Sequence, residues 1–170
     1  MKKKFLLITL LAALTFSVAM PSATGTAQAA SHVKSHPALF DKTRFALHLG
    51  FAYFAFHHFV YNPYRAGSFK AHSSHRTRSI LSAGVALLVT YHELKKSYDI
   101  AKGSNSGVLH ALIKPLNGLI NTASRVASKL RGGQYNDNEV KGIVNSANSF
   151  SKQATHNGIN IRDIPVPGLH

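Results

Sequence analysis

Residues 78–102, RSILSAGVALLVTYHELKKSYDIAK, contain the pattern that decides the fold class. Their apolar and small side chains alternate at spacings of four and three residues, which is the spacing of one face of a packed helix. The sequence therefore predicts a helix over 78–102 that is apolar on most faces in its first half and amphipathic in its second. Gly103 is expected to end it. The predicted buried face comprises Ile80, Gly84, Leu87, Tyr91, Leu94, Tyr98 and Ala101.

Two further helices are predicted on the C-terminal side of this segment. Residues 107–131 repeat the same spacing, and Pro115 is expected either to kink this helix or to mark a late start. Residues 136–155 begin with Asn136 as an N-cap and Glu139 three positions later, which is the pattern of a capping box. The predicted buried residues are Leu109, Ile113, Leu116, Ile120, Ala123, Ala127 and Leu130 in the first helix and Val140, Ile143, Val144, Ala147, Phe150 and Ala154 in the second.

A fourth helix is predicted on the N-terminal side, from Asp41 as N-cap to about residue 61. The dipeptide Asn62-Pro63 is expected to end it, because proline disfavours helical geometry in the preceding residue. Residues 45–61, FALHLGFAYFAFHHFVY, are apolar on every side and rich in aromatic residues. A helix of this kind is buried either in a protein core or in lipid.

These segments predict an all-α fold of four helices, arranged as two αα-hairpins (41–102 and 107–155) after an N-terminal signal-peptide helix. Residues 30–40 are expected to be a lead-in linker, and residues 64–77 a basic connection without apolar periodicity. The tail, 156–170, contains two prolines and is predicted to be extended.

The first 29 residues have the organisation of a signal peptide. A lysine-rich start precedes an apolar run over 5–18, and the motif Ala27-Gln28-Ala29 has the small residues that a signal peptidase requires. Cleavage is expected after Ala29. The sequence therefore predicts a bacterial protein that is secreted or associated with the cell envelope.

The composition argues against an enzyme. The chain has only six acidic residues and no cysteine, so carboxylate pairs are scarce and thiolate chemistry is excluded. The nucleophile-elbow pattern and the glycine-rich nucleotide loops are both missing from the sequence. No cofactor is therefore expected.

The eleven histidines raise the question of a metal site. If the helices over 41–61 and 78–102 are antiparallel, His48 lies near His92 and Glu93. These three groups are the only metal-ligand candidates that we identify, and a buried hydrogen-bonded cluster is the favoured interpretation, because no motif spacing fixes a site.

An integral membrane protein is the alternative to a bundle core. Residues 45–61 and 80–94 would then form a hairpin of short membrane segments in the cell membrane. Both segments are at or below the length that a span needs, and both contain ionisable groups that lipid disfavours.

The excess of basic residues is the remaining functional signal, with 20 Lys and Arg and a net charge of +14. Outside a bacterial cell the anionic partners are lipid headgroups and wall polymers. Sequence-specific nucleic-acid binding is not expected for an exported chain without a recognition-helix motif. The sequence thus predicts a non-catalytic helical protein that associates electrostatically with the anionic cell envelope, through basic residues that include Arg65, Lys70, Arg76, Arg78, Lys95 and Lys96.

Overall fold

The structure, a computed structural model, describes residues 38–168. Within that range every regular element is a helix and none is a strand, so the predicted all-α class is confirmed for this part of the chain. The predicted signal peptide, 1–29, and the lead-in up to residue 37 lie outside the described residues.

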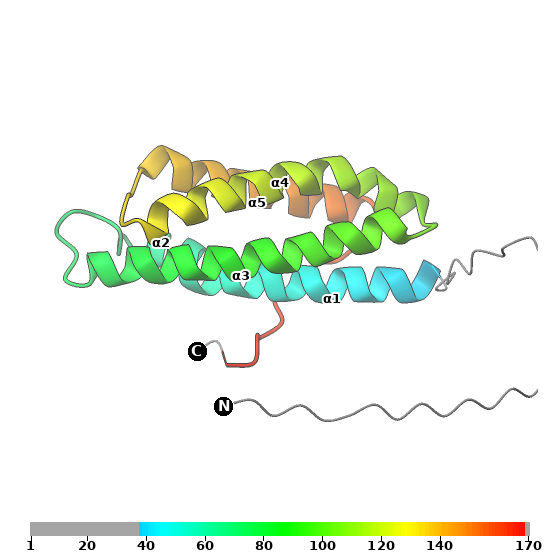
Figure 1. Cartoon of the computed structure of the whole chain (residues 1–170), viewed down its shortest axis with the longest axis horizontal. Coiled ribbons are helices and arrows are strands. Elements are labelled where there is room, and N and C mark those ends of the chain that lie inside the picture. The colour runs from blue at the N-terminus through cyan, green and yellow to red at the C-terminus, as the bar shows by residue number, and fades with distance from the viewer. Residues whose placement is uncertain (1–37, 169–170) are drawn as a thin grey trace, which may run out of the picture. The chain divides into compact units, whose positions relative to one another are not determined.

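Four long helices make up most of the described chain (Figure 1). They are α1 (Ala38–Phe56), α3 (Arg76–Gly103), α4 (Gly107–Arg131) and α5 (Asp137–His156). Between α1 and α3 the chain continues through a π-helical turn, His57–Tyr61, and a short helix, α2 (Asn62–Arg65). None of the helices described is both long enough and apolar enough to cross a membrane.

Several predicted helix ends are wrong by a few residues. The first helix already includes Ala38, so Asp41 is not its N-cap but lies in the first turn, where it is buried and complements the helix dipole. Gly103 belongs to α3, and Ser104 is the C-cap. Because α4 begins at Gly107, Pro115 lies inside the helix, and the predicted late start is wrong.

The dipeptide Asn62-Pro63 widens the helix instead of ending it. Proline has no N–H to donate to the carbonyl of Phe59, and its ring would clash with that carbonyl in a regular α-helix. The chain instead forms a π-helical turn, in which the N–H of Asn62 bonds to the carbonyl of His57, five residues earlier. Pro63 then lies in the first turn of α2, where its missing N–H is not needed.

The four helices enclose one apolar core. Helix α3 packs against both α1 and α4, and α4 packs against α5. The hydroxyl of Tyr53 on α1 donates to the carbonyl of Ala147 on α5 at 2.5 Å, which links the first and last helices. The aromatic segment 45–64 contributes to this core: Phe45, Tyr53 and Phe56 are buried, and its other aromatic residues are half-buried.

The predicted periodic positions face this core. All six predicted residues of α5 are buried, as are all those of α4 except the half-buried Ile113. In α3 the exceptions are Tyr91 and Tyr98, which are half-buried against the core. The grouping of the helices into two separate hairpins stays a prediction, because α3 packs against both of its neighbours in the chain.

The C-terminal tail lies against α1. The predicted start of the tail at residue 156 is wrong by one residue, since α5 includes His156, and residues 159–166 form no helix or strand. The N–H of Ile164 donates to the carbonyl of Gly50 at 3.1 Å, and Asp163 pairs with His57 at 2.8 Å. A Cβ atom on Gly50 would lie 2.6 Å from the carbonyl oxygen of Arg162, so the tail needs glycine there. The tail therefore covers one side of a helix that is apolar all round.

Candidate functional site

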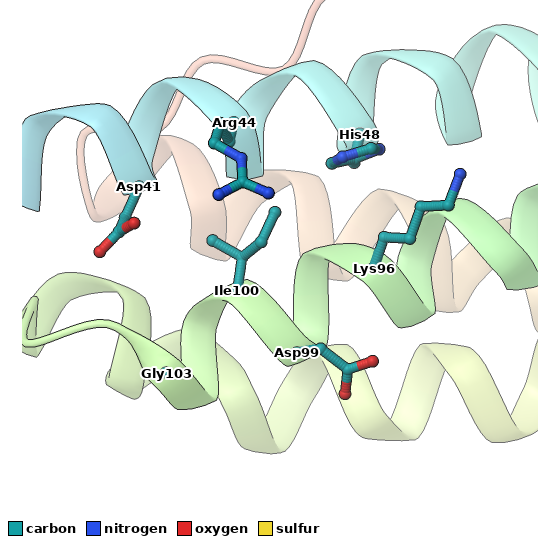
Figure 2. Close-up of a pocket in the computed structure, with 7 residues that line it drawn as sticks. All are labelled: Asp41, Arg44, His48, Lys96, Asp99, Ile100 and Gly103. Carbon is teal, nitrogen blue, oxygen red and sulfur yellow. The ribbon is translucent and has the colours of Figure 1, made fainter. Parts of the chain in front are cut away.

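Two places in the bundle bring together the side chains that the sequence analysis selected. The first is a surface groove between α1 and α3, which we call the α1–α3 groove (Figure 2). The second is the loop end, where the connection from α2 to α3 (66–75) meets the connection from α4 to α5 (132–136). Figure 1 shows both connections at the same end of the helices.

The α1–α3 groove borders a hydrogen-bonded group of three side chains. His48 Nδ1 lies 2.6 Å from Glu93 Oε2, and Lys96 Nζ donates to Glu93 Oε1 at 2.7 Å. Hydroxyl groups of α3 hold the same antiparallel alignment on either side, since Ser97 donates to the carbonyl of Phe45 and Thr90 to that of Ala52. The predicted proximity of His48 and Glu93 is thus confirmed.

The third predicted metal ligand, His92, lies apart from this pair. It is exposed, and its ring lies edge-on to Tyr91, with the ring centroids 5.4 Å apart. Successive residues of a helix point about 100° apart, so His92 and Glu93 face different directions. Among residues 38–168 no three His, Asp or Glu side chains gather closely enough to hold a metal ion. The predicted set of His48, His92 and Glu93 therefore does not assemble.

The environment of Glu93 favours its charged form. Burial opposes ionisation, but the hydrogen bonds from Lys96 and His48 outweigh it, so the pKa of Glu93 lies below its ordinary value. Both carboxylate oxygens are engaged by protein groups. Glu93 is therefore a charged carboxylate, and its hydrogen bond with His48 joins α1 to α3.

The groove itself carries mixed charge. It has a volume of about 530 Å³. Figure 2 shows Arg44 and His48 reaching it from α1 and Lys96, Asp99 and Ile100 from α3. Asp41 and Gly103 complete the lining, which therefore contains two acids and two bases and no hydroxyl or thiol side chain. Such a surface carries little net charge.

The loop end is ordered around one buried aromatic side chain. Phe69 is 1% exposed and packs against Tyr64 and Tyr135, at ring-centroid distances of 6.4 and 5.5 Å. The N–H of Lys70 bonds to the carbonyl of Gly67 at 3.0 Å, and Gly67 has a positive φ of 75° that favours glycine. The basic connection is therefore a folded loop with an apolar anchor.

Aromatic rings hold two of the basic side chains at the loop end. The guanidinium of Arg65 lies over the ring of Tyr61, 5.6 Å from its centroid. The guanidinium of Arg76 lies 5.7 Å from the centroid of the Tyr135 ring, and its Nε donates to the carbonyl of Phe69 at 3.0 Å. These contacts orient the cations without neutralising them.

The six predicted envelope-contacting residues separate into two groups. Arg65, Lys70, Arg76 and Arg78 gather at the loop end. Lys95 and Lys96 lie in the second half of α3. An α-helix rises about 1.5 Å per residue, so these lysines are roughly 30 Å along the helix from Arg76. There they pair with Asp99 at 3.1 Å and with Glu93. The predicted set is therefore not one surface.

A small pocket lies within the loop end, which we call the loop-end pocket. It has a volume of about 260 Å³. Its lining residues come from two segments that are distant in the sequence, the end of α2 with the connection that follows it and the connection before α5 with the first residue of α5: Tyr64, Arg65, Gly67, Phe69, Lys70, Tyr135 and Asp137. The hydroxyl of Tyr135 donates to Asp137 at 2.8 Å. Burial and this hydrogen bond raise the pKa of Tyr135, so the hydroxyl stays protonated at neutral pH.

Phe69, Tyr135 and Asp137 were not among the predicted site residues. Phe69 is the one large apolar residue in the connection 66–75, and Tyr135 stands between a glycine pair and the N-cap Asn136. An isolated aromatic residue in a polar loop is a signal for an anchor, but the contact between the two loops was not predictable from the sequence of either loop.

Comparison with known proteins finds no matching family model, no matching curated protein and no matching solved structure.

Proposed function

We propose that this chain is an exported, non-catalytic protein that binds the anionic surface of the cell envelope through the cations of its loop end. In this proposal the signal peptide, 1–29, is cleaved after Ala29, and the hairpins 41–102 and 107–155 form the mature domain. The export motif at Ala27-Gln28-Ala29 supports the proposal, and so does the charge of the mature chain, which is +11 once the three lysines of the signal peptide are subtracted from +14.

The placement of the charges at the loop end is the observation that carries the proposal. Arg65, Lys70 and Arg78 are exposed there, and Arg76 is half-buried beside them. One acidic residue, Asp137, lines the pocket at this end. Each basic residue near an anionic lipid surface contributes about 1 kcal/mol of attraction, so the group suffices for measurable binding.

Electrostatic binding of this kind is expected to weaken steeply with salt. The Debye length falls from about 10 Å at 0.1 M to about 3 Å at 1 M ionic strength, which screens exposed charges from an anionic surface. Mature protein should therefore leave a membrane or wall pellet in a high-salt wash without detergent.

Co-sedimentation of the mature chain with anionic and with neutral vesicles tests the proposal. The triple variant Arg65→Gln/Lys70→Gln/Arg78→Gln should bind anionic vesicles on the order of 100-fold more weakly than wild type. The matched control, Lys114→Gln/Arg125→Gln/Lys152→Gln, removes the same charge from exposed positions on α4 and α5. This control variant should lose much less of its affinity for anionic vesicles.

Two results would contradict the proposal. Equal losses in the two triple variants would show that total charge, and not the loop end, governs binding. Retention of wild-type protein through the high-salt wash, with release only by detergent, would show that binding is not electrostatic.

A further inference from the structure

We propose that the loop-end pocket binds a polyol phosphate unit, such as the repeating unit of an anionic wall polymer. This inference rests on the proposed function, because it specifies the ligand that the loop end meets at the cell envelope. It is independent of the net charge of the chain, since it depends on the walls of one pocket.

The size of the pocket limits the ligand to a small group. Pockets for drug-sized molecules usually measure about 300–1,000 Å³, whereas the loop-end pocket measures about 260 Å³. One glycerol or one small sugar residue is of suitable size for this space, and an extended oligosaccharide is not. The pocket therefore fits one unit of a polymer.

The walls of the pocket suit the carbon skeleton and hydroxyl groups of a polyol. Tyr64 and Tyr135 supply aromatic faces, against which C–H groups pack favourably, and Phe69 packs against both. Asp137 lines the pocket together with both tyrosines and accepts the hydrogen bond of the Tyr135 hydroxyl at 2.8 Å. This carboxylate is an acceptor for ligand hydroxyls.

The remaining lining residues suit a phosphate. Arg65 and Lys70 line the pocket, and the guanidinium of Arg76, which is not part of the lining, lies 5.7 Å from the centroid of the Tyr135 ring. The side chain of Lys70 runs close to Gly67, and the guanidinium of Arg65 is held over Tyr61. Because the loop is already folded around Phe69, little ordering is needed on binding.

The α1–α3 groove is larger but is a poorer candidate for the same ligand. Its two acids and two bases balance one another, and its lining includes no aromatic side chain apart from His48. The loop-end pocket combines an excess of cations with two aromatic walls, and we therefore assign the phosphate ligand to it.

Titration of ¹⁵N-labelled mature protein with glycerol 3-phosphate tests the inference. The amide signals of residues 64–70 and 135–137 should shift with saturation at millimolar ligand. Inorganic phosphate and glycerol, each tested alone, should bind at least tenfold more weakly. Equal affinity for inorganic phosphate, or shifts confined to the α1–α3 groove, would overturn the assignment.

A variant that keeps every charge separates this inference from the proposed function. Tyr64→Leu removes one aromatic wall and should weaken glycerol 3-phosphate binding at least tenfold, while Leu81→Ala, a substitution at an exposed site on α3, should not. If wild type binds anionic vesicles but not glycerol 3-phosphate, the pocket assignment fails and the proposed function stands. If it binds neither, both fail.

Competition experiments identify the source of the ligand. Glycerol 3-phosphate should displace the protein from an immobilised poly(glycerol phosphate) polymer. The same concentration should weaken binding to phosphatidylserine vesicles much less, because Arg78 lies outside the pocket lining. Displacement from phosphatidylglycerol vesicles but not from the polymer would overturn the wall-polymer assignment in favour of a lipid headgroup, and stronger competition by a single-stranded oligonucleotide would overturn the polyol assignment altogether.

Discussion

The two ends of α3 hold their basic residues in different ways. In the second half of the helix, Lys95 and Lys96 pair with the carboxylates of Asp99 and Glu93, and Lys95 also lies over the ring of Tyr98, so what differs between the two ends is the carboxylate partner. At the loop end, the guanidinium groups of Arg65 and Arg76 lie over tyrosine rings. A carboxylate partner cancels the charge of a cation, whereas an aromatic partner orients the cation and leaves its charge in place.

This difference shows why the net charge alone does not locate a binding surface. With six acidic residues in the chain, the positions of the acids decide where the basic residues act on their surroundings. Glu139 likewise pairs with Lys129. Two carboxylates, Asp137 and Glu139, lie beside the loop end in the first turn of α5, but they contact Tyr135 and Lys129, so the loop end is distinguished by cations with which these carboxylates do not pair.

Removing the anchor of the loop end should have the largest effect. Phe69→Ala deletes a side chain that is 1% exposed and should lower the free energy of unfolding by about 3–5 kcal/mol. Thermal unfolding measures the loss, and Leu81→Ala, at an exposed position, should cost far less. The folded variant should also bind anionic vesicles weakly although every cation is retained. An unchanged melting temperature would contradict the role of Phe69.

Removing the carboxylate in the second half of α3 should have an intermediate effect. Glu93→Gln weakens two hydrogen bonds to basic side chains and should cost about 1.5–3 kcal/mol in chemical denaturation. The control Asp99→Asn removes an exposed pair with Lys95 and should cost about 0.2–1 kcal/mol. By freeing Lys96, Glu93→Gln should also make this half of α3 bind anionic vesicles more strongly. Equal losses in the free energy of unfolding for Glu93→Gln and Asp99→Asn would refute the distinction between the part-buried carboxylate and the exposed one.

The contribution of Glu93 should depend on pH. Because its pKa is lower in the folded chain than its ordinary value of 4.5, the carboxylate stabilises the fold above that pH. The stabilisation is lost as the pH falls through the folded pKa. The difference in melting temperature between wild type and Glu93→Gln should therefore be largest near neutrality and shrink below about pH 4. A constant difference across this range would contradict the charged pair.

Removing the cap beside Tyr135 should have the smallest effect. The side chain of Asn136 accepts hydrogen bonds from the N–H groups of Asn138 and Glu139, so Asn136→Ala should cost about 1 kcal/mol. The neighbouring Asn138→Ala should be close to neutral. If the cap positions the pocket wall, the aromatic signals of Tyr135 will shift in the first variant but not in the second. Identical Tyr135 signals in the two variants would show that the cap does not position the pocket wall.

Much of the fold was predictable because its determinants are local. The spacings in α3, α4 and α5 follow from one helical period, and the N-cap of α5 is confirmed by the contacts of Asn136. The capping box is confirmed only in part, since the carboxylate of Glu139 binds Lys129 instead. The predicted end of the first helix was wrong because the chain forms a π-helical turn before Asn62-Pro63. Whether a helix ends or widens before a proline depends on the packing of the residues that follow.

The sites were less predictable because they join distant segments. The pairing of His48 with Glu93 followed from an antiparallel alignment of two adjacent helices, which the sequence already indicated. The loop-end pocket needs Phe69 and Tyr135 to meet across the bundle, and no periodicity relates those two positions. The covering of α1 by the tail was missed for the same reason.

The contact between the tail and α1 has a consequence for the order of folding. Asp163 and His57 are 106 positions apart, so α1 stays uncovered on one side until the segment around Asp163 has been synthesised. Contacts of such long range close late, because the chain must lose much of its freedom before they form. This order suits the proposed export, since α1 is not yet covered by the segment around Asp163 while the chain passes through a narrow channel.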